Sequence, residues 1–387
     1  MNPAICTLLN AGRVVAGPGS IERLPDLVDE LGGRRVLIVS DQGVARAGLV
    51  DRPPQLLVAA GLAVTVLDDT PPEPEVKHVE MLFAAAKAAG GADVVVGIGG
   101  GSAMDVAKIL AVLLAQPVTL SALLAREPIR RRGLPTVMVP TTAGTGSEAT
   151  PNAIVLVPED ELKVGIVSPR LMPDGVILDP LLTLSLPPAI TASTGMDALT
   201  HAIECYCSRK GNLFSDLYGL EAIRLIAGSI RRAYEHGSDV HARHDMLLGA
   251  YYGGVCIATS STTAVHALAY PLGGKYRIAH GLSNAMLLPF VMEFNLVGSE
   301  PRFHAMAAAM GLPVAGLAPH AAGERMIEAL YALNADLGIV SSLRDKGITA
   351  RDVEGLVDGA AKVTRLLDNN PRPMTRSDMH AIYERLL

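Results

Sequence analysis

The chain has few charged residues, few cysteines and no long apolar run, and each scarcity excludes a class of protein. Charged residues make up 19% of the chain, the net charge is -6 and the longest basic run is Arg130–Arg132. This pattern offers no electrostatic footprint for a nucleic acid or an anionic membrane. Glycine, serine, threonine and proline interrupt the most apolar region, residues 251–274, so no segment is suited to span a membrane.

The start of the chain and its composition favour a cytoplasmic protein that binds a small molecule. The opening residues, MNPA, begin no basic stretch followed by an apolar one, so we expect no secretory leader. Hydrophobic residues make up 49% of the chain, which indicates a heavily buried protein whose remaining apolar surface favours self-association. The four cysteines are too few for a disulfide framework. Cys205 and Cys207 are expected to be buried thiols, with metal binding as the weaker alternative.

Two domains are expected, over residues 1–185 and 186–387, because 387 residues exceed what one hydrophobic core usually organises. In the first domain, β-branched runs alternate with helical patterns such as 74–89 and 102–115, which predicts a mostly parallel sheet covered by helices. The predicted strands span residues 36–40, 63–69, 93–101, 134–142, 153–157, 163–167 and 175–180, the fifth and sixth forming a hairpin.

Strand signals stop after residues 186–190, and the rest of the chain has helical periodicity, as in 216–235 and 324–338. The fold class is therefore an α/β N-terminal domain followed by an all-α C-terminal domain. The cleft between two such domains is the usual place for a ligand.

The segment VVVGIGGGSAMDVAKIL predicts a strand, a glycine turn at Gly99, Gly100 and Gly101, and a helix capped by Ser102. Glycines let the backbone approach a phosphate closely, and the exposed N–H groups of a new helix favour an anion. This turn therefore predicts a pyrophosphate site. A plain tight turn between strand and helix explains the same residues equally well.

A second loop, PTTAGTGSEAT at residues 140–150, also follows a predicted strand and supplies hydroxyl donors at Thr141, Thr142, Thr145 and Ser147. Two such loops at parallel strand ends can line one crevice. Asp41 ends another strand, where a carboxylate can accept from a ribose 2'-hydroxyl and repel a 2'-phosphate, which favours NAD over NADP; a helix N-cap is the alternative. Because Asp41 precedes the glycines, the order differs from the usual dinucleotide fingerprint.

GMDALTHAIE places Asp197 and His201 four residues apart on an apolar helix, so both side chains lie on one helical face. Downstream, His266 and His280 flank a bend that we expect at the Gly- and Pro-containing segment between them. Each residue alone is more typical of a hydrogen-bonded core position. Together they call for a shared divalent cation, because burying unpaired carboxylates is costly, and imidazole-rich ligation suits Fe(II), Zn(II), Ni(II) or Co(II). The other seven histidines are expected on the surface or in loops.

Four segments, GGGSAMDVAK, PTTAGTGSE, LPPAITASTGMDALTHAIECY and VHALAYPLGGKYRIAHG, resemble in order and spacing the signatures of the iron-containing (group III) alcohol dehydrogenases. The resemblance covers nearly the whole chain. It implies the dehydroquinate synthase-like arrangement of an N-terminal dinucleotide-binding domain and a C-terminal helical domain. It also implies a homodimer or larger assembly, and an activity that transfers hydride between an alcohol carbon and NAD while a metal polarises the substrate oxygen.

By this resemblance, the metal ligands are Asp197, His201, His266 and His280. The cofactor contacts are Asp41 for NAD preference, Gly99 to Ser102 for the pyrophosphate, and Thr141, Thr142, Thr145 and Lys163 near the rest of the molecule. Catalytic roles fall to His280 and Tyr270. Tyr270 is a departure, because many members of the family have a histidine there that is considered for proton relay, and a tyrosine cannot serve as a near-neutral base without a large pKa shift. Ala103 likewise replaces a frequent proline.

Three alternatives remain at this point. A maleylacetate-reductase-like enzyme on the same fold would work without metal, and a glycerol-dehydrogenase-like enzyme would use zinc. A catalytically silent NAD-binding protein is the third, because a fold does not prove turnover.

Overall fold

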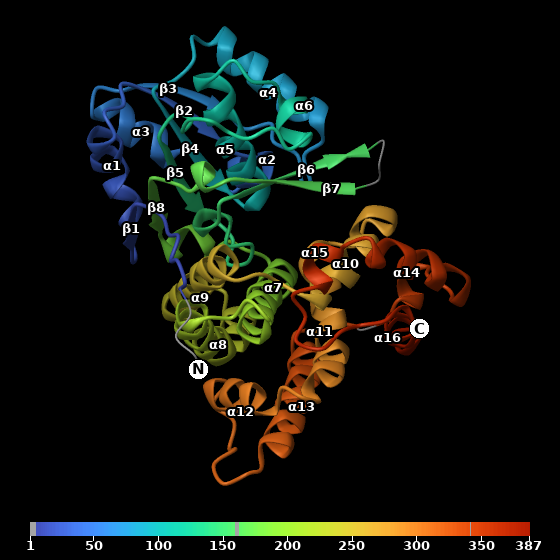
Figure 1. The fold of residues 1–387 in the computed structure, drawn as a ribbon. Coiled ribbons are helices and arrows are strands. Elements are labelled where there is room, and N and C mark those ends of the chain that lie inside the picture. Colours follow the sequence, from blue (N-terminus) through green and yellow to red (C-terminus); the bar gives the residue numbers. More distant parts are fainter. Residues whose placement is uncertain (1–4, 159–161, 341) are drawn as a thin grey trace. The chain divides into compact units, whose positions relative to one another are not determined.

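The computed structural model describes residues 5–158, 162–340 and 342–387. The four opening residues, on which the expected absence of a leader rests, lie outside this range. The chain divides into two compact units, an α/β unit of Leu9–Ser185 and a helical unit that comprises Leu186–Leu387 and the residues before Leu9. Figure 1 labels the elements of both units.

The α/β unit is built on a six-stranded sheet of order β1-β8-β5-β4-β2-β3, in which every strand pairs in parallel with its neighbours. The strands are β1 (Arg13–Ala16), β2 (Arg35–Val39), β3 (Ala63–Leu67), β4 (Val94–Gly99), β5 (Thr136–Pro140) and β8 (Gly175–Leu178). The parallel sheet predicted from the alternating pattern is confirmed. Strand β1 was not predicted; its four residues, RVVA, are mostly exposed and pair with β8.

Helices cover both faces of this sheet, because its central strands are apolar on both sides. Leu37 and Val39 of β2 pack in one core with helices α4 (Val76–Ala88), α5 (Gly101–Ala115) and α6 (Leu120–Leu124). Val36 and Ile38 face the opposite core, with α1 (Leu24–Glu30), α2 (Gln42–Arg46) and α3 (Arg52–Ala59). The predicted hairpin forms as antiparallel β6 (Asn152–Val157) and β7 (Leu162–Val167), and its residues Ala153 and Val155 extend the first core.

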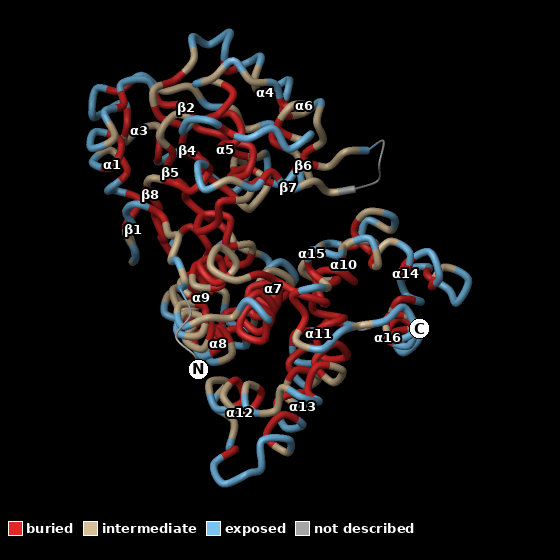
Figure 2. Tube along the Cα trace, in the orientation of Figure 1, coloured by how far each residue is buried: buried red, intermediate tan, exposed pale blue. Residues whose placement is uncertain are grey.

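The helical unit has no strand among its described residues, as predicted. Its helices are α7 (Pro188–Cys207), α8 (Leu213–Glu235), α9 (Val240–Thr259), α10 (Ala264–Tyr276), α11 (His280–Leu296), α12 (Glu300–Ala309), α13 (Pro319–Asp336), α14 (Val353–Ala361), α15 (Thr364–Leu367) and α16 (Arg376–Arg385). Figure 2 shows α7 as one of the most deeply buried segments. In the part of the chain that the structure describes, no helix combines the length and the apolar character needed to cross a membrane.

The chain does not turn where the sequence predicted between His266 and His280. Helix α10 continues through Pro271 and the following glycines as far as Tyr276. It ends at Arg277, whose backbone is left-handed at φ 53° and whose N–H donates to the Gly273 carbonyl, while the Ile278 N–H reaches the Leu272 carbonyl. The bond from Arg277 to Gly273 is the one that characterises an αL cap, and both bonds satisfy carbonyls in the last turn of the helix. The bend therefore comes from the helix end and not from the proline.

Candidate metal centre and nucleotide site

The buried face of α7 positions the first two candidate metal ligands. Asp197 and His201 are four residues apart and are 3% and 5% exposed. The carboxylate Oδ1 lies 3.8 Å from the His201 Nε2. The predicted common face is thus present, and it is buried within the helical unit.

Helices α10 and α11 bring the other two ligands to the same point. His266 is on the first turn of α10, and His280 is the first residue of α11. Gly281 lets α11 approach α7, because a Cβ atom at this position would lie 2.2 Å from the Ser193 carbonyl oxygen and 3.2 Å from Asp197 Cβ. Backbone contact therefore sets His280 beside the carboxylate.

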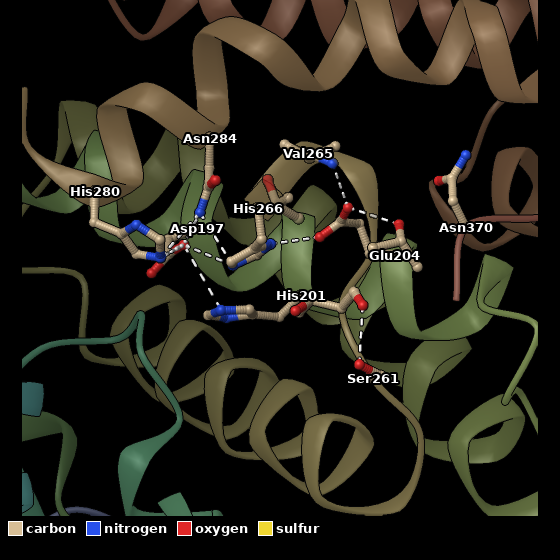
Figure 3. Close-up of polar contacts among 12 residues, drawn as sticks. Asp197, His201, Glu204, Ser261, Val265, His266, His280, Asn284 and Asn370 are labelled. Carbon is tan, nitrogen blue, oxygen red and sulfur yellow. Dashed lines mark hydrogen bonds and ion pairs between the residues drawn. The ribbon is translucent and has the colours of Figure 1, made fainter. Parts of the chain in front are cut away.

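The four side chains form one cluster whose possible ligand atoms all lie within 4.8 Å of one another. The Nε2 atoms of His266 and His280 each lie 3.8 Å from Asp197 Oδ1, as does that of His201. Figure 3 shows these side chains, which come from α7, α10 and α11, pointing toward one another. Two atoms that bind one tetrahedral ion at about 2.1 Å lie roughly 3.4 Å apart, so the spacing suits a shared cation.

The surroundings of the cluster also fit a cation. The Asn284 Nδ2 donates to Asp197 Oδ1 at 2.7 Å and lies 3.1 Å and 3.3 Å from the Nε2 atoms of His266 and His280. Acceptor atoms of three residues therefore point toward one hydrogen-bond donor, as they would toward a cation. Burial acts to raise the pKa of Asp197, but the three imidazoles and the Asn284 amide outweigh it and hold this pKa below its ordinary value. The carboxylate is thus ready to bind a divalent metal ion.

Glu204 lies behind His266 and was not identified from the sequence. It is fully buried on α7, and its Oε2 contacts the His266 Nδ1. Its Oε1 accepts hydrogen bonds from the Thr263 Oγ1 and the Val265 N–H, both at 2.7 Å. Burial acts to raise the pKa of Glu204, but His266 and Thr263 outweigh it and lower this pKa. A carboxylate seven residues after Asp197 on the same apolar helix was the available signal.

Tyr270, the second catalytic candidate, lies next to the metal cluster. Its ring centre is 6.1 Å from that of His280. Burial raises the pKa of its hydroxyl above the ordinary value, which favours the protonated form that can donate a hydrogen bond. Cys205 and Cys207 are buried, as predicted, and so is Cys256. None of the seven histidines outside the cluster is buried.

In the α/β unit, the two predicted loops meet at the carboxyl ends of β4 and β5. The Thr141 N–H donates to the Gly99 carbonyl at 3.0 Å. A Cβ at Gly101 would lie 2.9 Å from a side-chain atom of Thr145, and one at Gly100 would lie 3.6 Å from Thr142 Oγ1. The glycine turn and the hydroxyl loop are therefore in direct contact, as a shared nucleotide site requires.

Asp41 joins this site from the end of β2. Its Oδ1 caps α2 by accepting from the Gly43 and Val44 N–H groups at 2.8 Å and 3.0 Å. The alternative interpretation of Asp41 as an N-cap is therefore correct for this oxygen. Its Oδ2 faces the glycine turn, because a Cβ at Gly99 would lie 3.1 Å from it. At φ 152°, Gly99 has a backbone conformation that favours glycine.

Ser102 and Lys163 are connected through Glu73. The predicted cap at Ser102 is wrong, because α5 begins at Gly101 with Gly100 as its N-cap. The Ser102 hydroxyl instead accepts from the Glu73 N–H at 3.2 Å, and the Glu73 carboxylate pairs with Lys163 Nζ at 2.5 Å. Lys163 of β7 is thus linked to the first turn of α5.

A buried ionic network, formed by Asp105, Lys108 and Ser147, lies beneath these loops and was not recognised in the sequence. The Lys108 Nζ contacts four acceptors, which are the Ser147 carbonyl, the Ser147 Oγ and the carbonyls of Thr150 and Asn152, at 2.6 to 3.1 Å. The Ser147 Oγ also donates to Asp105 at 2.5 Å. The Ser147 hydroxyl thus already has a donor and an acceptor within the protein. Its predicted contact with the cofactor stays a prediction.

Glu148 completes the buried charge of this region. It is 1% exposed, and burial raises its pKa from 4.5 to about 7. Asp105 and Lys108 occur three residues apart in DVAK, and Glu148 follows Ser147 in TGSE. The signals were therefore present in the two motifs already singled out for the nucleotide.

The chain thus combines an α/β unit that carries a glycine-rich turn between strand and helix with a helical unit that carries four possible metal ligands. Residues 11–180 match the family model described as iron-containing alcohol dehydrogenase, and residues 191–387 match the one described as Fe-containing alcohol dehydrogenase family, C-terminal. The chain belongs to the iron-containing alcohol dehydrogenase family, as the sequence motifs indicated.

Individual relatives align with this chain over nearly their whole length. Long-chain-alcohol dehydrogenase 1 of Geobacillus thermodenitrificans is 40% identical over 95% of this chain and 93% of its own. The structure of a 1,3-propanediol oxidoreductase superimposes with a TM-score of 0.94 at 33% identity, covering 99% of this chain and all of its own. A sulfoacetaldehyde reductase of Bifidobacterium kashiwanohense, solved with NAD+, gives 0.90 at 27% identity over 99% of both chains. The names of these proteins differ in substrate.

Proposed function

We propose that this protein is an NAD(H)-linked alcohol dehydrogenase, or aldehyde and ketone reductase, that requires a divalent metal such as Fe(II) or Zn(II). The observation that carries the proposal is the buried cluster of Asp197, His201, His266 and His280. A complete set of four donors disfavours a metal-independent reductase on the same fold. A metal held by these residues supplies Lewis acidity to the substrate oxygen.

The residues of the cluster prepare the site for a positively charged ligand. Asp197 contributes a negative charge, and the imidazoles contribute neutral nitrogen donors. Burial keeps competing water away from these donors and strengthens their electrostatic effect. Tyr270 is proposed to donate a hydrogen bond near His280, because its raised pKa makes it a poor base at neutral pH.

The α/β unit is proposed to bind the dinucleotide at the carboxyl ends of its central strands. Gly99, Gly100 and Gly101 would hold the pyrophosphate through backbone N–H groups at the start of α5. The contact of this turn with Thr142 and Thr145 supports a common site for both loops. The solved relative that contains NAD+ also supports NAD as the cofactor. We further propose Thr141, Ser147 and Lys163 as neighbours of the cofactor.

The metal requirement is tested by anaerobic removal of metal with a chelator, followed by addition of Fe(II) or Zn(II). We expect alcohol-dependent NAD+ reduction to be lost and then restored. A panel of alcohols and aldehydes, assayed with metal-defined protein, identifies the substrate. Unchanged turnover in protein shown by elemental analysis to be free of metal would exclude this function and favour the maleylacetate-reductase-like alternative. Absence of turnover across the panel would favour a silent nucleotide-binding protein.

The cofactor preference is tested with Asp41→Asn. Asparagine keeps an oxygen acceptor for the N-terminus of α2 but removes the negative charge that faces the glycine turn. We expect the ratio of kcat/KM for NAD+ over NADP+ to fall at least about tenfold, because the repulsion of a 2'-phosphate is lost. An unchanged ratio would contradict the assignment of Asp41.

A homodimer or larger assembly and a cytoplasmic location complete the proposal. The high apolar content of the chain supports self-association. Light scattering in solution would measure the mass of the assembly.

A further inference from the structure

The carboxylate of Glu204 contacts a metal-ligand histidine from the side that faces away from Asp197. Its Oε2 contacts the His266 Nδ1, and the His266 Nε2 lies 3.8 Å from Asp197 Oδ1. Figure 3 shows the imidazole of His266 between Glu204 and the other members of the cluster. The two ring nitrogens therefore have different tasks.

The contacts of Glu204 show that it acts as an acceptor. Its other oxygen, Oε1, accepts from the Thr263 hydroxyl and the Val265 N–H. A carboxylate that receives these donors is suited to accept a third hydrogen bond from an Nδ1–H group. This arrangement leaves the lone pair of the imidazole at Nε2.

Asn284 imposes the same requirement from the opposite end of the ring. Its amide atom 2.7 Å from Asp197 Oδ1 must be the NH2 group, because two acceptor oxygens would repel each other at this distance. The same NH2 group lies 3.1 Å from the His266 Nε2, which then has to be an acceptor. Two independent contacts thus favour the tautomer with the proton on Nδ1.

We propose that Glu204 is a positioning residue of the metal centre, which holds the Nδ1–H tautomer of His266 and thereby sets the affinity of the four-residue site for a divalent metal. This inference rests on the proposed metal-dependent function. Outer carboxylates that orient metal-binding histidines typically contribute 10- to 100-fold in metal affinity. The role is distinct from catalysis, because Glu204 acts through His266.

The central test compares metal-free full-length protein with its Glu204→Gln variant in competition titrations with Zn(II) and a chromophoric chelator. Glutamine keeps an oxygen for Thr263 and Val265, but its NH2 group would face Nδ1 and favour a proton on Nε2. We expect Zn(II) affinity to fall by about 10- to 100-fold. The absorption spectrum of Co(II)-loaded protein should change as well, because one ligand is weakened. An unchanged affinity would overturn the proposal.

A matched control separates this role from simple packing. Thr263→Val removes a hydrogen bond to the same carboxylate without changing a group that contacts His266. It should leave Zn(II) affinity within about threefold of wild type, well below the 10- to 100-fold loss expected when an outer carboxylate is removed. An equal loss in both variants would show that Glu204 only supports the fold, and would overturn the proposal.

The pair is tested directly with a double-mutant cycle that includes His266→Ala. If Glu204 acts through His266, adding Glu204→Gln to His266→Ala should cause no further loss of Zn(II) affinity. Far-ultraviolet circular dichroism reports whether the helical unit, which contains all of these positions, is folded in each variant. A further loss as large as in the wild-type background would overturn the proposal.

The tautomer is measured without any variant, so the test survives a folding failure of Glu204→Gln. In zinc-loaded wild-type protein labelled with 15N-histidine, NMR should show a proton on Nδ1 of His266 and metal bound through Nε2. Binding through Nδ1 would overturn the role of Glu204 while leaving the proposed function intact. Failure of wild-type protein to bind Zn(II) or Fe(II) would instead overturn the proposed function.

Discussion

Asp105 of the α/β unit and Asp197 of the helical unit are both buried beside other titratable side chains, but their charges are compensated differently. In the α/β unit, Asp105 lies 3.7 Å from Lys108 Nζ and accepts hydrogen bonds from Ser147 and from the Ile154 N–H. In the helical unit, Asp197 faces three imidazoles and the Asn284 amide. The first carboxylate has a cation supplied by the chain itself, whereas the second is surrounded by groups that ligate metals.

This difference teaches how to distinguish a structural ionic site from a functional one. The Lys108 ammonium group donates to backbone carbonyls of the loop after β5 and of β6. Its role is therefore to hold these two segments of the backbone together. The imidazoles around Asp197 can instead present lone pairs to a common point. A buried carboxylate therefore indicates function when its neighbours are further ligands and not a fixed cation.

The comparison is tested most severely by His201→Ala. We expect this variant to lose alcohol-dependent NAD+ reduction and to bind Zn(II) more than about 100-fold more weakly, because a direct ligand is removed. NAD+ affinity should not change. His304→Ala, a histidine outside the cluster, serves as the control in the same chelator titration and activity assay. Normal metal binding by His201→Ala would contradict the ligand assignment.

A second change breaks the structural site instead. Lys108→Met should reduce the free energy of unfolding by about 3 to 5 kcal/mol, because it leaves Asp105 buried without its cation. Urea unfolding measures the effect. Lys108→Met combined with Asp105→Asn should recover part of the loss, because the uncompensated charge is then also removed. A larger loss in the double variant would show that the pair does not act as a unit.

The smallest expected effect concerns Glu148, whose pKa is raised from 4.5 to about 7 by burial. The stability that its protonated form contributes is complete below about pH 4.5 and is lost as the pH rises through about 7. Glu148→Gln is neutral at every pH and should avoid this loss. Relative to wild type, its free energy of unfolding should rise by at most about 3 kcal/mol over this interval. Urea unfolding at several pH values would reveal a constant difference if Glu148 does not titrate there.

Periodicity was sufficient to predict most of the fold because the central strands and long helices have strong apolar patterns. The continuous apolar run of β4 and the helical pattern of α5 indicated one strand-turn-helix unit, which the structure confirms. Strand β1 escaped notice because four mostly exposed residues give neither an alternation nor an apolar run. It is defined by its pairing with β8, more than a hundred residues away in sequence.

The metal cluster was predictable in composition but not in its supporting contacts. The spacing of Asp197 and His201 predicted a shared helical face, and the apolar segment with glycine and proline downstream supplied His266 and His280 before the family motifs agreed. Glu204 could not be assigned in the same way, because its partners come from the start of α10. The turn before His280 was misplaced because Pro271 is tolerated within α10.

The absent side chain at Gly281 has a consequence for how this scaffold can be altered. Main-chain atoms of Ser193 occupy the space that a methyl group at position 281 would need. The position of the candidate ligand His280 therefore depends on the lack of a side chain at Gly281. Any side chain at position 281 would push the start of α11 away from α7 and would carry His280 away from Asp197. Engineering of substrate range should accordingly treat this glycine as fixed.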